Sequence, residues 1–140
     1  MLRSLTIGNV ALIDQLDMTF YDGFSVLTGE TGAGKSIIIE ALNFVLGERA
    51  SRELIKSGAP KASVEAAFQI ESGSQAFDVL SGMELAPEDG ELILYRELSA
   101  AGKSVCRCNG TLISAAMLKE IGDALVDIHG QHAHQALLNP

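Results

Sequence analysis

Apolar and polar residues alternate in short runs along the chain, and these runs predict strands arranged around one apolar helix. In the N-terminal part, the apolar positions of residues 2–20 favour two strands in a hairpin, with Gly8-Asn9 as the turn. After a tight turn at 21–23, residues 24–28 form a short β-prone run. Residues 37–46 are apolar on nearly every side, which is typical of a deeply buried helix. Three strands are therefore expected before the first helix.

The middle of the chain predicts further strands. Gly47 is placed to cap the first helix, and residues 48–60 form a polar connection with one helical turn around Leu54 and Ile55. Residues 71–90 are rich in Ser, Gly, Glu and Asp and are interpreted as a surface segment around a short amphipathic piece. Alternation of apolar and polar residues predicts strands over 62–70, 91–98, 105–108 and 111–113.

The C-terminal part carries a turn signal, a helix signal and a last apolar run. Asn109-Gly110 favours a hairpin turn between the two short strands beside it. Ser114 is a good N-cap for a helix that ends near Gly122. Residues 124–128 are apolar and are predicted to form a strand that leads into the polar segment 129–135.

Composition places the chain among folded globular proteins. It has 140 residues, enough for one domain, with 47% hydrophobic and 20% charged residues. No run approaches the length of a membrane span and the N-terminus lacks the pattern of a signal peptide, so a cytoplasmic location without membrane contact is expected. Cys106 and Cys108 lie too close for an ordinary disulfide framework and are interpreted as small strand residues in a reducing compartment.

Charge limits the kind of nucleic-acid binding that the chain supports. The net charge of −8 disfavours a protein that coats nucleic acid with its whole surface, because such binding needs many cations. Arg49, Arg52, Lys56 and Lys61 form a local basic cluster. Acidic residues alternate with these cations, so a solvated face is favoured over a nucleic-acid patch, which stays open as the alternative.

Residues 29–36 carry the strongest chemical signal. They match the phosphate-cradling pattern G-x-x-x-x-G-K-[ST] with Gly29, Glu30, Thr31, Gly32, Ala33, Gly34, Lys35 and Ser36. Its glycines let consecutive N–H groups approach phosphate oxygens, and the helix that follows adds its positive end. Lys35 would reach the β- and γ-phosphates, and the Ser36 hydroxyl would ligate Mg²⁺. A nucleotide site is therefore predicted.

Four segments together resemble those of the bacterial RecN family, whose members are SMC-like proteins of the ABC ATPase superfamily. They are the opening Leu2-x-x-Leu5-x-Ile7-x-Asn9, the loop 28–36, the continuation 46–50 and the late run 128–135, Ile-His-Gly-Gln-His-Ala-His-Gln. The resemblance covers the whole chain. It implies an α/β P-loop NTPase of ABC/SMC-head type, with a mixed sheet around the P-loop helix and an antiparallel β subregion. Because complete members continue into a coiled coil and a second lobe, residues 1–140 would form an incomplete head, the N-terminal lobe.

The resemblance also assigns roles to single residues. Gln131 matches the Q-loop glutamine, which helps to hold Mg²⁺, senses the γ-phosphate and would act in catalysis with Lys35. Arg49 matches an arginine that lies near the nucleotide after the first helix, and Asn9 falls where the first strand approaches the base. The residues themselves agree for Gln131, because a polar amide after a buried strand near a phosphate loop is where ligand contacts concentrate.

The resemblance further implies ATP and Mg²⁺ as cofactors, and as partners the C-terminal lobe of the same protein and a second head in a homodimer. In such proteins ATP binding docks two heads and hydrolysis releases them during repair of DNA double-strand breaks, in the cytoplasm at the nucleoid. The Walker B residues and the signature loop are not found in this chain. Nucleotide binding that is at best weak and ATPase activity near zero are therefore expected from residues 1–140 alone.

Two other functions remain open. One is a complete small kinase or phosphotransferase with Asp127 as metal ligand at the end of a strand, and the other is a dimerisation module that binds nucleotide without hydrolysis. Leu80-Ser81-Gly82 resembles the start of an ABC signature but lacks its second glycine. The histidines and cysteines match no standard zinc spacing; they are His129, His132, His134, Cys106 and Cys108.

Overall fold

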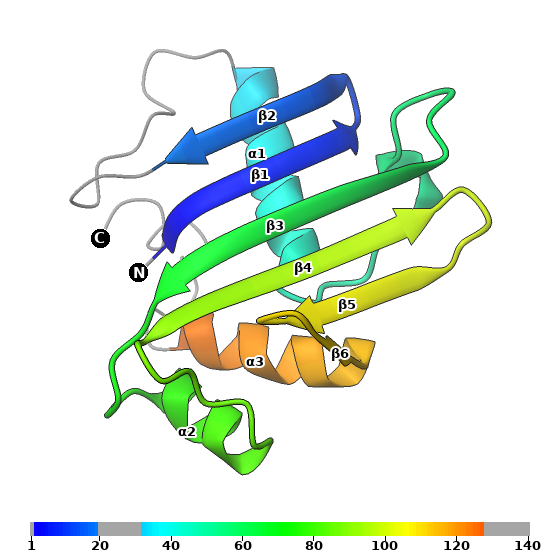
Figure 1. Ribbon diagram of the computed structural model, residues 1–140. Coiled ribbons are helices and arrows are strands. Elements are labelled where there is room, and N and C mark those ends of the chain that lie inside the picture. The colour runs from blue at the N-terminus through cyan, green and yellow to red at the C-terminus, as the bar shows by residue number, and fades with distance from the viewer. Residues whose placement is uncertain (1, 20–31, 128–140) are drawn as a thin grey trace.

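The computed structural model describes residues 2–19 and 32–127, which fold as one antiparallel sheet covered by helices (Figure 1). The strands are β1 (Leu2–Val10), β2 (Ile13–Thr19), β3 (Lys61–Gln69), β4 (Glu91–Ser99), β5 (Ser104–Cys108) and β6 (Thr111–Ile113). The helices are α1 (Gly32–Val45), the short 3-10 helix η1 (Arg52–Leu54), α2 (Gln75–Gly82) and α3 (Ala115–Asp127). In this part of the chain, no helix is long and apolar enough to cross a membrane.

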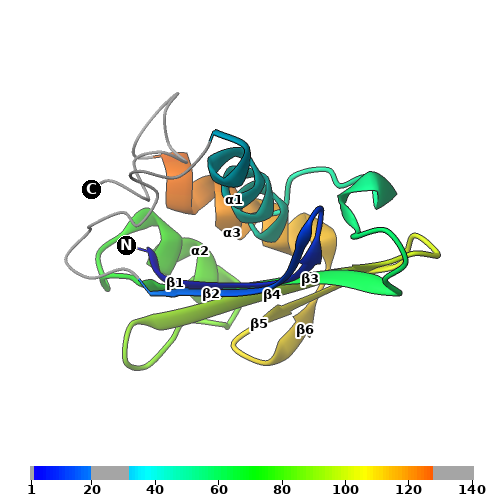
Figure 2. The same cartoon turned by 90° about the horizontal axis from the view of Figure 1, so that it is seen from above.

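The sheet is six-stranded, in the order β2-β1-β3-β4-β5-β6, and each neighbouring pair is antiparallel. Figure 2 shows α1 and α3 together on one face of it. The strands alternate accordingly: in β3, Val64 and Phe68 point to the helices and are fully buried, whereas Lys61 and Glu65 on the other face are exposed. The predicted antiparallel subregion is confirmed, and residues 24–28 lie outside the described residues.

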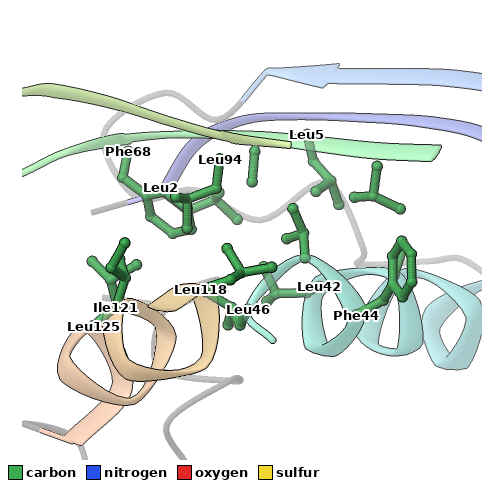
Figure 3. Close-up of a cluster of buried hydrophobic side chains, with 14 of the residues drawn as sticks. Leu2, Leu5, Leu42, Phe44, Leu46, Phe68, Leu94, Leu118, Ile121 and Leu125 are labelled. Atoms are coloured by element: carbon green, nitrogen blue, oxygen red, sulfur yellow. The ribbon is translucent and has the colours of Figure 1, made fainter. Parts of the chain in front are cut away.

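The core lies between this sheet and the helices. Figure 3 shows Phe68, Leu2 and Leu94 directed from the strands toward Leu118 and Ile121 of α3. All five side chains are at most 1% exposed. Because the strands contribute every second residue and the helices one face each, the alternating pattern of the sequence accounts for this two-layer arrangement.

The first hairpin turns later than predicted. Residues 8 and 9 remain in β1, and the turn is formed by Ala11 and Leu12, with Ala11 at φ 52°. The longer strand buries Val10 completely and pairs it with Ile55, and Lys56 N donates to Asn9 O at 2.8 Å. Burial of Val10 thus outweighs the turn preference of Gly8-Asn9.

The strand predicted at residues 124–128 is wrong, because α3 continues to Asp127. Leu118, Ile121 and Leu125 recur at helical spacing and are all buried against the sheet layer. Gly122, interpreted from sequence as the helix end, instead lies inside α3, where a Cβ would stand 1.9 Å from Leu46 O. The glycine is needed for a close crossing of two backbones and not for a turn.

Several local predictions are confirmed. Gly47 adopts φ 97° just after α1, and its N–H donates to Phe44 O at 3.1 Å, as expected of a C-cap. Asn109 and Gly110 have φ of 48° and 85° in the β5–β6 turn. Ser114 Oγ accepts from Met117 N at 3.0 Å and caps α3. The short amphipathic piece predicted within residues 71–90 is α2.

Candidate nucleotide-binding site

The predicted phosphate loop runs directly into α1. Gly29, Glu30 and Thr31 lie outside the described residues, and α1 begins at Gly32. The backbone of residues 32–35 is therefore the first turn of the helix, whose N–H groups have no partner within the helix. Ser36 follows and is exposed. Unpaired N–H groups, the positive end of the helix and an accessible hydroxyl fit the phosphates and the Mg²⁺ of a nucleotide.

Helix α1 is held against the sheet by one face. Ile38, Ala41, Leu42 and Val45 are buried, whereas Glu40 is exposed. Among the residues of α1 whose side chains are described, only Ser36 and Glu40 are exposed, so the expected burial on nearly every side is met except along one narrow strip. This packing is one of the contacts that set the direction of the helix axis, and so the place of its first turn over the sheet.

The C-terminal end of α1 is bound by an arginine that the sequence analysis missed. Arg96 is 6% exposed and is the one buried charged side chain among the described residues. Its Nη1 donates to Phe44 O at 2.8 Å and to Glu48 O at 2.6 Å, and its guanidinium lies 4.6 Å from the centre of the Phe44 ring. Burial lowers the pKa of Arg96 from its ordinary value. The available signal was a charge at a core position of an alternating strand, between Leu94 and Leu98.

Arg49 follows the helix whose first turn carries the end of the phosphate loop. It is exposed and follows the C-terminal end of α1, whereas Lys35 and Ser36 lie at the other end. A helix rises about 1.5 Å per residue, so about 14 Å separates Ser36 from Val45 along the axis. Arg49 lines a groove of about 480 Å³ together with Glu40, Asn43, Glu48 and Glu53, and Glu40 lies about one helical turn from Ser36. Gly29, Glu30 and Thr31 lie outside the described residues, so the contact of Arg49 with the nucleotide stays a prediction.

The basic cluster is partly neutralised. Lys56 Nζ lies 2.9 Å from Asp14 Oδ1, and Lys61 Nζ lies 3.2 Å from Glu97 Oε1. Arg49 and Arg52 are exposed. Two of the four cations therefore have acidic partners, which favours the solvated-face interpretation over a nucleic-acid patch.

Some of the remaining predicted site residues lie in the part of the chain that the structure describes, and others lie outside it. Gln131 and the three histidines lie outside the described residues. Asp127 ends helix α3 and does not follow a strand, so its place does not fit a Walker B aspartate. Leu80 is fully buried in α2, consistent with rejection of that segment as a signature loop. Among the residues described, no group of three or more metal-ligating side chains of the His, Cys, Asp and Glu types is found.

Both cysteines are buried on the helix-facing side of β5 and are free thiols, as predicted. Burial raises the pKa of Cys108 to about 11, so this thiol stays protonated at neutral pH. A reactive or metal-binding role for Cys108 is disfavoured by this environment.

A polar cluster on the face of the sheet away from the helices makes the stability of the fold depend on pH. Tyr95 donates from its hydroxyl to Glu97 Oε1 at 2.6 Å, and burial together with this bond raises the pKa of Tyr95 to about 12. Since the folded pKa is above the unfolded value of about 10, the stability contributed by the neutral phenol is lost as pH rises from about 10 to 12. We expect Tyr95→Phe to be less stable at neutral pH but to lose less stability over this range, measured by urea unfolding. Parallel alkaline slopes for the two proteins would contradict it.

The family model described as an AAA domain matches residues 4–103, and the chain therefore belongs to the AAA domain family. Two solved structures share the fold. One is from a study of ATP-driven dimerization and DNA stimulated activation of SMC ATPases, with TM-score 0.69 and 25% identity over 88% of this chain and 78% of that one. The other is the SMC head domain from Thermotoga maritima, with TM-score 0.63 and 23% identity over 85% of this chain and 41% of that one. The predicted SMC-head type of fold is confirmed.

Relatives found by sequence similarity identify a narrower group of proteins than the family model and the solved structures do. The DNA repair protein RecN of Halalkalibacterium halodurans is 47% identical over 139 residues, which is 99% of this chain and 25% of the relative. RecN of Bacillus subtilis is 46% identical over 138 residues, 99% of this chain and 24% of the relative. RecN of Haemophilus influenzae is 47% identical over 140 residues, 99% of this chain and 25% of the relative. The resemblance to RecN is thus confirmed, and the chain spans about a quarter of the length of these relatives.

Proposed function

We propose that this chain is the ATP-binding N-terminal lobe, residues 1–140, of a RecN-like head that acts in repair of DNA double-strand breaks. The observation that carries the proposal is the unbroken motif at residues 29–36, which enters a helix held on an antiparallel sheet of SMC-head type. In the complete protein, ATP binding would engage two heads of a homodimer and hydrolysis would release them from each other. The C-terminal lobe and DNA would be further partners.

Each part of the loop has a physical role in this proposal. The first-turn N–H groups of α1 would donate to the phosphates, Lys35 would supply a positive charge, and Ser36 would hold Mg²⁺. Gln131 would be the second Mg²⁺ ligand and would help to orient water. Bound ATP with Mg²⁺ supplies a phosphoryl group that is ready for transfer to water. The chain lacks a Walker B pair and a signature loop, so turnover by this chain alone would be close to zero.

Replacement of Lys35 tests nucleotide binding directly. Lys35→Ala removes a charge-assisted contact, and we expect the affinity for ATP with Mg²⁺ to fall about tenfold or more. Isothermal titration of the 140-residue chain measures it, and Lys103→Ala, which removes an exposed lysine in the β4–β5 turn, serves as the charge-matched control. Equal binding by wild type and Lys35→Ala would refute the assignment of the loop, and so would failure of the wild-type chain to bind ATP.

A further inference from the structure

Arg96 holds the end of α1 that lies away from the phosphate loop. Besides its two bonds from Nη1 to Phe44 O and Glu48 O, its Nε donates to Ser104 Oγ at 3.2 Å. One side chain of β4 therefore ties the last turn of α1, the residues after it and the start of β5 together. A guanidinium has several donors in a fixed plane, so it can make these bonds at once.

The charge of Arg96 is met by backbone carbonyl groups and a hydroxyl, and not by an acidic side chain. Within the described residues, no carboxylate lies within salt-bridge distance of it. The carbonyl groups at the C-terminal end of a helix carry partial negative charge, and Phe44 O is one of them, whereas the second acceptor, Glu48 O, belongs to the segment that follows α1. Because a buried cation is costly unless it is fully hydrogen-bonded, Arg96 and the end of α1 depend on each other.

Helix α3 confines the same turn. A Cβ on Gly122 would lie 1.9 Å from Leu46 O, and one on Gly47 would lie 2.5 Å from the Cα of Lys119. These distances leave no room for the C-terminal turn of α1 to shift toward α3. The turn is therefore held between the arginine of β4 and the backbone of α3.

We infer that Arg96 is a positioning residue for the phosphate loop, because it fixes one end of a stiff helix whose other end carries Lys35 and Ser36. The inference rests on the proposed nucleotide binding and deepens it. A helix that is released at one end can tilt or slide, and a ligand held by several N–H groups tolerates little displacement. Arg96 touches no nucleotide in this scheme and acts only through α1.

The test compares Arg96→Met with wild type and with a variant that lowers stability elsewhere. Ile113→Ala removes a buried side chain from β6, at the edge of the sheet away from α1. All proteins are titrated with ATP and Mg²⁺, and with inorganic tripolyphosphate, at a temperature where circular dichroism shows each to be fully folded. We expect Arg96→Met to bind both about tenfold more weakly and Ile113→Ala to bind within about twofold of wild type.

Arg96→Lys keeps the charge but cannot span all three acceptors, so an intermediate loss of affinity is expected, and it replaces Arg96→Met if the latter does not fold. If both Arg96 variants bound ATP and tripolyphosphate as tightly as wild type, the positioning role of Arg96 would be overturned, while the proposed nucleotide binding would stand. The same would follow if Ile113→Ala lost as much affinity as Arg96→Met, since destabilisation in general would then explain the effect. A wild-type chain that binds neither probe would refute the proposed function, and this role with it.

Discussion

Gly122→Ala is expected to destabilise the chain by about 3 kcal/mol or more, although alanine is the better helix former by about 1 kcal/mol. The added Cβ would lie 1.9 Å from Leu46 O, 2.8 Å from Leu46 C and 3.0 Å from Leu46 Cα. All three are backbone atoms, which cannot rotate away as a flexible side chain can. Helices α1 and α3 would have to separate, and urea unfolding followed by circular dichroism measures the loss.

The matched control is Gly82→Ala at the end of α2. No atom lies within 4 Å of a Cβ built there, so the same substitution is expected to leave stability nearly unchanged or slightly higher. If Gly122→Ala were as stable as wild type, the helices would be able to separate at no cost, and the close crossing would not explain the glycine. An equal loss in both variants would point to a general effect of the substitution.

The strands were predictable because their signal is local. In β3, alternate residues from Ala62 to Phe68 are buried, and in β4 the same rule holds from Leu92 to Leu98. Which side each residue faces follows from its place in the run alone. The turn at Asn109-Gly110 and the cap at Ser114 were predictable for the same reason, since neighbouring backbone groups satisfy them.

The failures share a different cause, because they depend on contacts between distant segments. Gly122 suggested a helix end until Leu46, far away in sequence, explained it as a crossing point. Val10 prolongs β1 because Ile55 pairs with it. Arg96 occupies a core position because carbonyl groups more than forty residues earlier accept its hydrogen bonds. Periodicity in a single sequence does not contain these partners.

The candidate site likewise combines a motif that is recognisable from local sequence with support from distant segments that is not. The loop at residues 29–36 is recognised from its own spacing, because each residue type has a separate task toward a phosphate. The support of the loop is not local: α1 is fixed by a buried face, by Arg96 and by α3. Arg49 was assigned through resemblance alone, and its contact with the nucleotide stays a prediction, although it shares a groove with Glu40, about one helical turn from Ser36. A motif thus identifies the groups that bind, and the fold decides which other residues can reach them.

Phe68→Ala is expected to cost about 3–5 kcal/mol, a large part of the 5–15 kcal/mol that stabilises a typical domain. Phe68 is fully buried, and its neighbours across the sheet are Leu2 on β1 and Leu92 on β4. Its ring points toward α3, so truncation leaves a cavity between the layers (Figure 3). The measurement is the free energy of unfolding from urea titration.

Leu112→Ala on β6 is the control, because this side chain is 64% exposed and also lies in a strand. Its loss is expected to stay below about 0.5 kcal/mol. Since the two residues share a sheet but differ in burial, the difference between them isolates the transfer and cavity energy of the core. A cost for Phe68→Ala as small as that for Leu112→Ala would mean that the sheet and α3 do not pack as one core in solution.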